Sequence, residues 1–584
     1  IDNLKGFINY PGKTTVGVFR KMTSNRKFFA NVLSTNAFKD MLKRDTTTIW
    51  KNMIKKMKYC DNVIMNQDAV KDFYDREPPI PIKAWTEVKD CTKETPMPLT
   101  FRKHKVELCG SEDCLYIEIS TPSVKPDRPL PVMFWIGCYV FAFTMDEILD
   151  PTLLTAQEVV FVRCSFRLGP FGFLSVNDFT APGNCGLKDI VVALKWVQRN
   201  INNFGGDSTN VTIFGSSTGG AIVHMMTLSP MATGLFHKAI IQSASALNNW
   251  SLTKNPAQPV MELGKILGVN SSHKTEIVDE LRSLPAEAIM EAFREMIHLH
   301  ALEDSKDIID AIFKPCIEEE FEGQPTFLTR YPASILKAGT FNKVPLIIGS
   351  NNIEGAIFQY KDQGFYDLSF EKYNKNKNLL VPKSLAVEPN VSKTIGHQLL
   401  KFYLGGEEEL REDTKAQYLQ LITDYYFLYY VNKTLRLHRQ FAPEVPIYYY
   451  ILNYAGEWSV PDDLKFLNSM GHSAEVPFIF RLKLPELPVC KGSRDSVTTR
   501  TRIVKMWTNF AKYGNPTPNE DDPLLHINWD PVESKDKLNY LSIGAELTKG
   551  INPYKERMSF WDALHKEHTF LRALVYFTDL GVCW

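Results

Sequence analysis

The sequence predicts an α/β fold with one large, mainly parallel central sheet flanked by helices, and two observations support it. From about residue 112 onward, short apolar runs alternate with longer segments of helical periodicity. The short runs are apolar throughout instead of alternating with polar residues, which is typical of strands covered on both faces. Because no linker-like stretch or internal repeat separates these segments, we expect one large domain with helical insertions.

The expected strands, in chain order, are residues 114–120 (CLYIEIS), 130–137 (LPVMFWIG), 158–166 (EVVFVRCSF), 210–215 (NVTIFG), 237–244 (HKAIIQSA), 343–351 (KVPLIIGSN) and 446–454 (PIYYYILNY). Residues 187–201 (LKDIVVALKWVQRNI) have apolar side chains at helical spacing, which predicts a helix between the third and fourth of these strands. The stretches 255–340 and 370–440 interrupt the later strands and are expected to be the helical insertions.

The composition is that of a soluble globular protein. Of the 584 residues, 44% are hydrophobic and 23% are charged, and a formal net charge of zero argues against a dedicated nucleic-acid-binding protein. The charge is nevertheless uneven, because residues 1–60 contain thirteen Lys or Arg and only three Asp. We therefore expect a divergent basic N-terminal segment (1–71) that is part of the same domain, the main domain (72–568) and an apolar C-terminal tail (569–584).

The two ends of the chain raise the question of membrane contact. Residues 46–60 (TTTIWKNMIKKMKYC) have apolar side chains at helical spacing with lysines between them. Such a helix can lie on an anionic membrane surface, although a surface helix packed on the core is the commoner outcome for this pattern. The tail is short and interrupted by Arg572 and Asp579, so we expect it to dock on the body of the protein, with membrane association as the alternative. No stretch approaches the ~20 apolar residues needed to span a bilayer.

A candidate nucleophile lies in the stretch TIFGSSTGGAIVHMM (212–226). Gly215, Ser217 and Gly219 fit the pattern G-x-S-x-G, with a strand-like run before it and an apolar helical run after it. An abrupt turn from strand to helix strains the backbone of the central serine, and glycines on either side avoid collisions. The turn exposes the hydroxyl at a helix N-terminus, where backbone N–H groups favour negative charge. A glycine-serine turn without chemistry is the alternative.

A serine hydroxyl needs a base to take its proton and an acid to orient that base. In folds with this motif the three residues follow one another in the order serine, acid, histidine. Glu354 follows the expected strand 343–351 and stands beside a glycine, and His472 lies in a loop late in the chain, before an apolar run. Either residue alone would usually be structural or exposed, but together with Ser217 they fit the expected order.

These and other stretches resemble the type-B carboxylesterase and cholinesterase family of α/β-hydrolases, and within it most the insect α-esterases. The resemblance covers about residues 72–568. The matching stretches are CGSEDCLYIEI, LPVMFWI, RLGPFGFLS, PGNCGLKDIVVALKWVQRNINNFGGDSTNVTIFGSSTGG, LFHKAIIQSASAL, VPLIIGSNNIEGAIF and GHSAEVPFIF. The resemblance implies an α/β-hydrolase domain that cleaves small carboxylic esters through an acyl-enzyme, without metal or cofactor. It also implies that Ser217 is the nucleophile, Glu354 the acid and His472 the general base.

The clearest departure from the family pattern is in the oxyanion loop. The family reads H-G-G-G-F there, whereas this chain has Gly137, Cys138, Tyr139, Val140 and Phe141. The two donor glycines thus correspond to Tyr139 and Val140, whose side chains restrict the backbone. Thr218, which follows the nucleophile, supplies the third N–H group. Losing one donor of this kind typically lowers the rate by ~10²–10³.

Two other departures are Ser216, which stands where the family has glutamate, and the missing proline-rich PYAxPP turn upstream. Cys91 and Cys114 resemble the family's first disulfide pair, but the cysteines of its later bridges have no counterparts. This pattern favours a reducing compartment, with a cytoplasmic or endoplasmic-reticulum-associated protein, while five sequons leave secretion open. The sequence gives no indication of an oligomeric state.

The leading interpretation is a serine carboxylic-ester hydrolase for small or medium lipophilic esters, with activity that the altered oxyanion loop can weaken. The alternative is a non-catalytic relative that binds or sequesters hydrophobic ligands, organophosphates or protein partners. The complete set of Ser217, Glu354 and His472 favours the enzyme, because a binding protein has no physical need for it. Slow turnover after acylation would instead make the protein a stoichiometric scavenger.

Overall fold

The computed structural model describes residues 61–64, 95–101, 107–144, 146–302, 311–359, 370–382, 385, 387–457, 469–483 and 492–579. The central sheet of this part of the chain has ten strands. Their spatial order is β1 (Asp61–Ile64), β4 (Tyr116–Ser120), β7 (Val160–Cys164), β5 (Leu130–Trp135), β8 (Gly206–Ser216), β9 (Lys238–Gln242), β10 (Leu346–Asn351), β11 (Ile447–Leu452), β13 (Asn539–Ile543) and β14 (Leu547–Ile551). Neighbours from β7 to β13 are parallel, whereas β1, β4 and β14 pair antiparallel at the two edges.

The mainly parallel sheet predicted from the sequence is thus confirmed. Each expected strand lies in it within four residues of its expected ends. The strands β1, β13 and β14, at the two ends of the sheet, were not expected. The strands β13 and β14 are partly exposed and lack the continuous apolar pattern. Two short antiparallel pairs lie outside the main sheet: β2 (Thr100–Phe101) with β3 (Leu108–Cys109), and β6 (Leu149–Asp150) with β12 (Arg481–Leu482).

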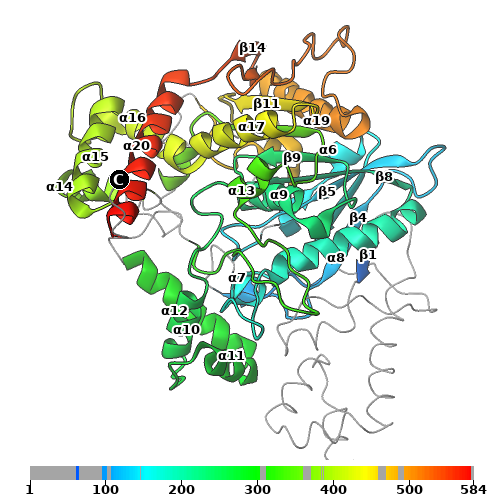
Figure 1. Cartoon of the computed structure of the whole chain (residues 1–584). Helices are drawn as coiled ribbons and strands as arrows, with labels where there is room; N and C mark the ends of the chain where they lie inside the picture. The colour runs from blue at the N-terminus through cyan, green and yellow to red at the C-terminus, as the bar shows by residue number, and fades with distance from the viewer. Residues whose placement is uncertain are drawn as a thin grey trace, which may run out of the picture.

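Helices cover both faces of the sheet (Figure 1). Within the described residues they are α6 (Thr152–Thr155), α7 (Gly169–Phe173), α8 (Cys185–Asn200), α9 (Thr218–Leu228), α10 (Ala257–Ile266), α11 (Lys274–Ser283), α12 (Ala286–Leu302), α13 (Pro332–Ala338), α14 (Phe370–Lys375), α15 (Pro389–Tyr403), α16 (Lys415–Thr423), α17 (Tyr429–Phe441), α18 (Val476–Ile479), α19 (Arg494–Tyr513) and α20 (Lys555–Asp579). The predicted helix 187–201 is α8, and the two predicted insertions contain α10 to α13 and α14 to α17.

Alternate residues of the central strand β5 divide the core into two layers. Val132 and Phe134 lie in the larger hydrophobic cluster with α8, α9, α13 and α17, whereas Met133 and Trp135 lie in a second cluster with α6, α18 and α19. All four side chains are at most 3% exposed. The period-two alternation of a strand therefore buries apolar side chains on both faces, which explains why the strand sequences are apolar throughout.

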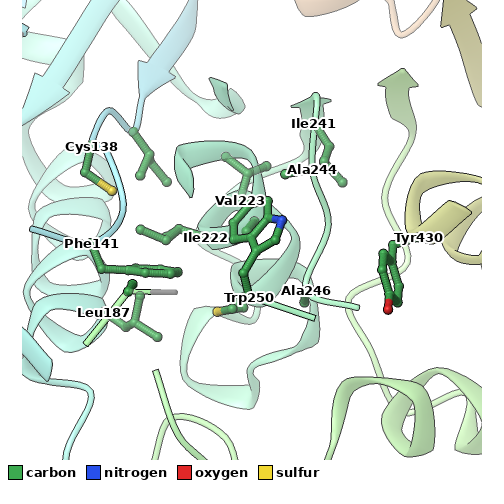
Figure 2. Close-up of a cluster of buried hydrophobic side chains, with 14 of the residues drawn as sticks. Cys138, Phe141, Leu187, Ile222, Val223, Ile241, Ala244, Ala246, Trp250 and Tyr430 are labelled. Carbon is green, nitrogen blue, oxygen red and sulfur yellow. The ribbon is translucent and has the colours of Figure 1, made fainter. Parts of the chain in front are cut away.

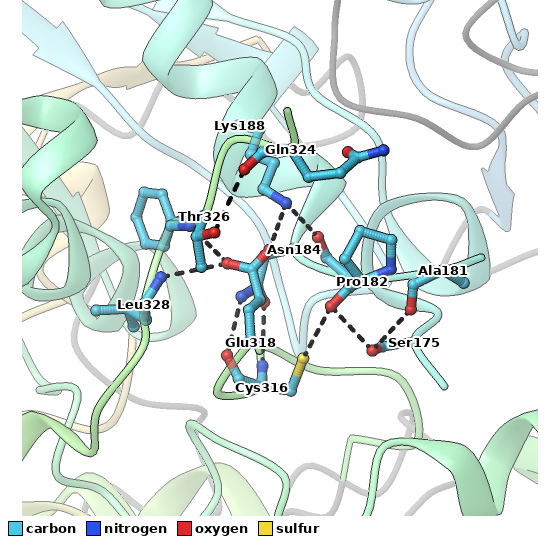
Figure 3. A network of polar contacts seen from close by, with 12 residues as sticks. Ser175, Ala181, Pro182, Asn184, Lys188, Cys316, Glu318, Gln324, Thr326 and Leu328 are labelled. Atoms are coloured by element: carbon cyan, nitrogen blue, oxygen red, sulfur yellow. Dashed lines mark hydrogen bonds and ion pairs between the residues drawn. The ribbon is translucent and has the colours of Figure 1, made fainter. Parts of the chain in front are cut away.

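A buried polar network attaches the first insertion to α8 (Figure 3). Lys188 of α8 forms an ion pair with Glu318, and both side chains are almost fully buried. The other carboxylate oxygen of Glu318 accepts the Leu328 N–H group at 3.2 Å, and Asn184 Nδ2 donates to the Cys316 carbonyl at 2.9 Å. Because a buried charge is strongly destabilising when its partner is removed, this network fixes residues 316–328 against the helix.

Two buried histidines, one on α9 and one on α17, are in contact on the face of the sheet that these helices cover. His224 Nε2 and His438 Nε2 are 2.9 Å apart, and His224 Nδ1 accepts the Ala246 N–H group. A neutral imidazole with an accepting Nδ1 has its proton on Nε2, so His224 donates and His438 accepts. Burial lowers the pKa of His224 well below its usual value and lowers the pKa of His438 to about 3. Both rings are therefore neutral at pH 7.

Acid should destabilise the fold through this pair. In the unfolded chain a histidine takes a proton below about pH 6.5, whereas the folded His438 does so only near pH 3. Stability that is present above pH 6.5 is thus lost as the pH falls, by about 2 kcal/mol for His438 at pH 5. We expect His438→Gln, which keeps an acceptor for His224, to flatten the dependence of the unfolding free energy on pH between 7 and 5.

Urea unfolding at pH 7, 6 and 5 measures this slope, and His273→Gln is the matched control because His273 is exposed on the same protein. If the His438→Gln and wild-type slopes coincide, the buried pair is not the source of the acid sensitivity.

Several predictions concern residues outside the described ranges. The amphipathic stretch 46–60 and nearly all of the basic segment 1–71 are among them, so membrane contact through this segment stays a prediction. At the other end, α20 continues across the expected boundary at 568 to Asp579. In the described residues, none of the helices is both long and apolar enough to cross a bilayer.

Candidate active site

A sharp turn between β8 and α9 presents Ser217. Its backbone has a positive φ, which is unfavourable for a residue with a Cβ atom (φ 57°, ψ −126°), and its N–H group donates to the Gln242 carbonyl at 2.9 Å. Glycine is required nearby: a Cβ atom at Gly219 would lie 2.1 Å from the Ile136 carbonyl oxygen, and one at Gly215 would lie 2.6 Å from the same atom. Ser217 is partly exposed although both neighbouring residues are buried, so the turn brings its hydroxyl to an accessible position.

The three residues expected to form a proton relay lie within hydrogen-bond distance. His472 Nε2 is 2.7 Å from Ser217 Oγ, and His472 Nδ1 is 2.5 Å from Glu354 Oε2. The second carboxylate oxygen, Glu354 Oε1, accepts the Asn351 N–H group at 2.6 Å. The ring and the carboxylate are almost completely buried, and the bond to Glu354 fixes the orientation of the imidazole.

The sheet topology explains why residues so far apart in the chain meet. Ser217 follows β8 and Glu354 begins the short η4 helix (Glu354–Gln359) after β10, while His472 precedes α18 in the segment after β11. The strands β8, β9, β10 and β11 are neighbours and parallel. Segments that follow them therefore emerge at the same edge of the sheet, where open α/β sheets bind their ligands.

Burial and the neighbouring imidazole act in opposite directions on the pKa of Glu354. Burial raises the pKa of its carboxyl group above the ordinary value, and the interactions with His472 oppose this effect. Such a carboxylate is stabilised most when the imidazole is positively charged. This arrangement suits a histidine that becomes protonated during a reaction.

Three neighbours of this relay were not predicted from the sequence: Glu475, Asn351 and Phe427. Ser216 Oγ donates to the Glu475 carboxylate, which also accepts Asn351 Nδ2 at 2.7 Å and is buried. The Phe427 ring lies 4.5 Å from the imidazole of His472, measured between centroids. Glu475 lies three residues after His472 in the recognised stretch GHSAEVPFIF, which was a usable signal. Phe427 had no such signal, because it belongs to a π-helical turn (Asp424–Leu428) whose register the sequence does not reveal.

The loop with the predicted oxyanion donors is anchored in the core. Cys138 and Phe141 belong to the hydrophobic cluster that includes Ile222 and Val223 of α9, and all four are labelled in Figure 2. Phe141 also packs edge-on against Phe173, with 5.3 Å between ring centroids. The loop backbone is therefore fixed by apolar side chains on both sides of the donor residues.

The N–H groups of this loop are already engaged. The Tyr139 N–H group donates to the Phe143 carbonyl at 2.7 Å, and the Val140 N–H group donates to Thr218 Oγ1 at 3.0 Å. In this conformation neither points freely toward a substrate, although the sequence assigned both to the oxyanion hole. Thr218 is the first residue of α9, and the first N–H groups of a helix have no acceptor in a preceding turn. Its N–H group therefore fits the predicted donor role.

Cys114 has no disulfide partner within the described residues, and its predicted pairing with Cys91 stays a prediction. The Cys114 side chain is buried, and burial raises the pKa of its thiol far above the ordinary value, so the thiol is protonated. Its expected partner Cys91 lies outside the described residues. Over the described ranges, His, Cys, Asp and Glu side chains do not gather in any group of three or more suited to a metal ion.

Comparisons with known proteins agree with this geometry. The model described as "Carboxylesterase family" matches residues 76–561. The chain is 32% identical to juvenile hormone esterase of Tribolium castaneum over 78% of each chain. It is 29% identical to venom carboxylesterase-6 of Apis mellifera, over 84% of this chain and 87% of the relative. It is 30% identical to liver carboxylesterase 1F of Rattus norvegicus, over 83% of this chain and 86% of the relative.

Solved structures agree as well. The crystal structure of juvenile hormone esterase from Manduca sexta, with OTFP covalently attached, aligns with a TM-score of 0.73 at 25% identity. The alignment covers 88% of this chain and 95% of that one. The large sheet and its surrounding helices are therefore shared over nearly the whole length of that protein.

Proposed function

Because the chain belongs to the carboxylesterase family, we propose that it hydrolyses small or medium lipophilic carboxylic esters through an acyl-enzyme on Ser217. Hydrolysis of carboxylic esters as such follows from the family and from relatives named as esterases. The size and polarity of the substrate and the roles of individual residues belong to the proposal. Its main support is the continuous hydrogen-bonded chain from Ser217 through His472 to Glu354.

Acylation begins when Ser217 Oγ attacks the carbonyl carbon of the ester. His472 Nε2 accepts the hydroxyl proton, and the Glu354 carboxylate stabilises the imidazolium that results. The proton then passes to the alkoxy oxygen, the alcohol leaves, and the acyl group stays bonded to Ser217. A water molecule gives a proton to His472 as its oxygen attacks the acyl carbon. The bond between that carbon and Ser217 Oγ then breaks, the imidazolium returns the proton to Ser217 Oγ, and the carboxylic acid leaves. The Thr218 N–H group stabilises the negative charge on the carbonyl oxygen in both steps.

The preference for lipophilic esters rests on the surroundings of the relay. The Phe427 ring covers one side of the His472 imidazole, and the oxyanion loop is backed by the hydrophobic cluster of Figure 2. An apolar environment of this kind favours burial of hydrocarbon acyl or alcohol groups by about 25 cal/mol per Å². It also strengthens the electrostatic interactions inside the site by excluding water.

A second candidate function is favoured by one observation. The Tyr139 and Val140 N–H groups donate to acceptors within the protein, which would weaken stabilisation of the oxyanion. A protein with this defect acts as a slow esterase, as a stoichiometric scavenger of acylating agents, or as a non-catalytic binder of hydrophobic ligands. The scavenger differs from the esterase only in the rate of deacylation.

Treatment of the purified protein with a fluorophosphonate probe and a series of p-nitrophenyl esters tests the proposal. We expect covalent labelling of Ser217 and steady release of p-nitrophenol over many turnovers. A burst of one equivalent without further turnover would identify a scavenger. Native protein that is neither labelled nor hydrolytic would contradict the proposed function and favour the binding protein.

A further inference from the structure

The oxyanion loop retains a glycine-like backbone although its residues have side chains. Val140 has φ 43° and Phe141 has φ 57°, and a positive φ is unfavourable for both because of the Cβ atom and, for Val140, the branch at it. Such strain persists only where the surroundings impose it. Here the fully buried Phe141 and the contact between Val140 and Thr218 impose it. The loop is therefore a fixed part of the site.

The two loop N–H groups are engaged in different ways. Tyr139 and Phe143 form an antiparallel bridge, in which the Tyr139 N–H group donates to the Phe143 carbonyl and the Phe143 N–H group donates back at 3.0 Å. Releasing this donor would break two backbone hydrogen bonds. The Val140 N–H group donates instead to a side-chain hydroxyl. A hydroxyl that accepts one hydrogen bond can still donate its own proton to a second acceptor.

The Thr218 hydroxyl group has a proton that it does not donate to any of the described residues. Its oxygen accepts from Val140, and within the described residues this is the single hydrogen bond of the side chain. The O–H proton is left to donate, on a residue that is only 2% exposed. A buried donor normally has an acceptor, and donors that lack one are unusual in native structures. Thr218 directly follows Ser217, so an oxygen atom bonded to an attacked carbon at Ser217 is a nearby acceptor.

We propose that the Thr218 hydroxyl is a catalytic donor of the oxyanion site, which replaces the donors that Tyr139 and Val140 no longer provide directly. As Ser217 attacks, the Thr218 O–H group donates to the carbonyl oxygen while the Val140 N–H group donates to Thr218 Oγ1. Because a hydroxyl that accepts one hydrogen bond becomes a stronger donor, the Val140 N–H group acts through it. Thr218 then contributes both its N–H and its O–H group. This inference rests on the proposed ester hydrolysis at Ser217.

Thr218→Val removes the hydroxyl and keeps the shape and the backbone N–H group. We expect it to lower kcat/KM for p-nitrophenyl esters by about 10²–10³, the usual loss for one oxyanion donor. Thr218→Ser keeps the hydroxyl and should recover most of that loss. Thr218→Ala, which also lacks the hydroxyl but has no branch at Cβ, should match Thr218→Val. Thermal unfolding of each variant checks that the fold is retained.

A trifluoromethyl ketone separates a catalytic from a structural role. Such a ketone forms a negatively charged hemiketal with a serine hydroxyl, whereas the corresponding secondary alcohol binds without forming an oxyanion. We expect the inhibition constant of the ketone to rise in Thr218→Val in parallel with the loss of kcat/KM, while that of the alcohol stays within about threefold.

Two outcomes would overturn the inference and leave the proposed function unaffected. If Thr218→Val and Thr218→Ala acylate as fast as the wild type, the hydroxyl has no part in the reaction. If they acylate faster, the hydroxyl obstructs the Val140 donor instead of extending it. A wild-type protein that is neither acylated nor hydrolytic would instead contradict the proposed function, and the role of Thr218 with it.

Discussion

Ser217→Ala is expected to lower kcat/KM for p-nitrophenyl esters by at least about 10⁴-fold and to abolish fluorophosphonate labelling. In the proposed reaction the hydroxyl oxygen is the atom that bonds to the acyl group, and it lies 2.7 Å from His472 Nε2. Without this oxygen, the ester can react only by direct attack of water, assisted by the remaining groups of the site. The measurement is initial-rate kinetics together with mass spectrometry of the labelled peptide 212–226.

Ser216→Ala is the matched control, because Ser216 is the adjacent hydroxyl and donates to Glu475 instead of His472. We expect this variant to be labelled by the probe at Ser217. If Ser217→Ala were labelled as fast as the wild type, or if Ser216→Ala alone lost labelling, the nucleophile would have been assigned to the wrong serine.

Glu354→Gln is expected to lower kcat/KM by about 10⁴-fold, although the substitution changes neither size nor shape appreciably. The Asn351 N–H group donates to Glu354 Oε1 at 2.6 Å, so the carbonyl oxygen of a glutamine would occupy that position. The amide NH₂ group would then face His472 Nδ1 and donate to it. This arrangement puts the imidazole proton on Nε2, where the ring can no longer accept the proton of Ser217.

The same kinetics on Glu354→Asp provide the comparison. Aspartate keeps the charge but shortens the reach to His472 Nδ1, now 2.5 Å from the carboxylate, so we expect an intermediate loss. A Glu354→Gln variant with more than a tenth of the wild-type kcat/KM, and with an unchanged melting temperature, would show that the carboxylate does not orient the imidazole.

Much of the fold could be predicted because each strand has a local signature. The runs 130–137 and 343–351 are apolar on both faces, and helices cover both faces of the corresponding strands β5 and β10. The strands β13 and β14, at one end of the sheet, escaped prediction since their residues are partly exposed and follow no clear period. The π-helical turn with Phe427 escaped for a different reason, because one extra residue per turn depends on tertiary packing.

The sequence by itself determined the strand order along the chain, the glycine turn around Ser217 and the order in which Ser217, Glu354 and His472 follow one another. These features are local, since they depend on residue size, periodicity and the glycines that a tight turn needs. Only the tertiary structure decided which groups meet, such as Ser216 with Glu475 and the Val140 N–H group with the Thr218 hydroxyl. The direction of an N–H group depends on the backbone angles of its own residue and the one before it. In this loop those angles are imposed by the packing of Phe141 and by contacts with α9, a segment some eighty residues further along the chain.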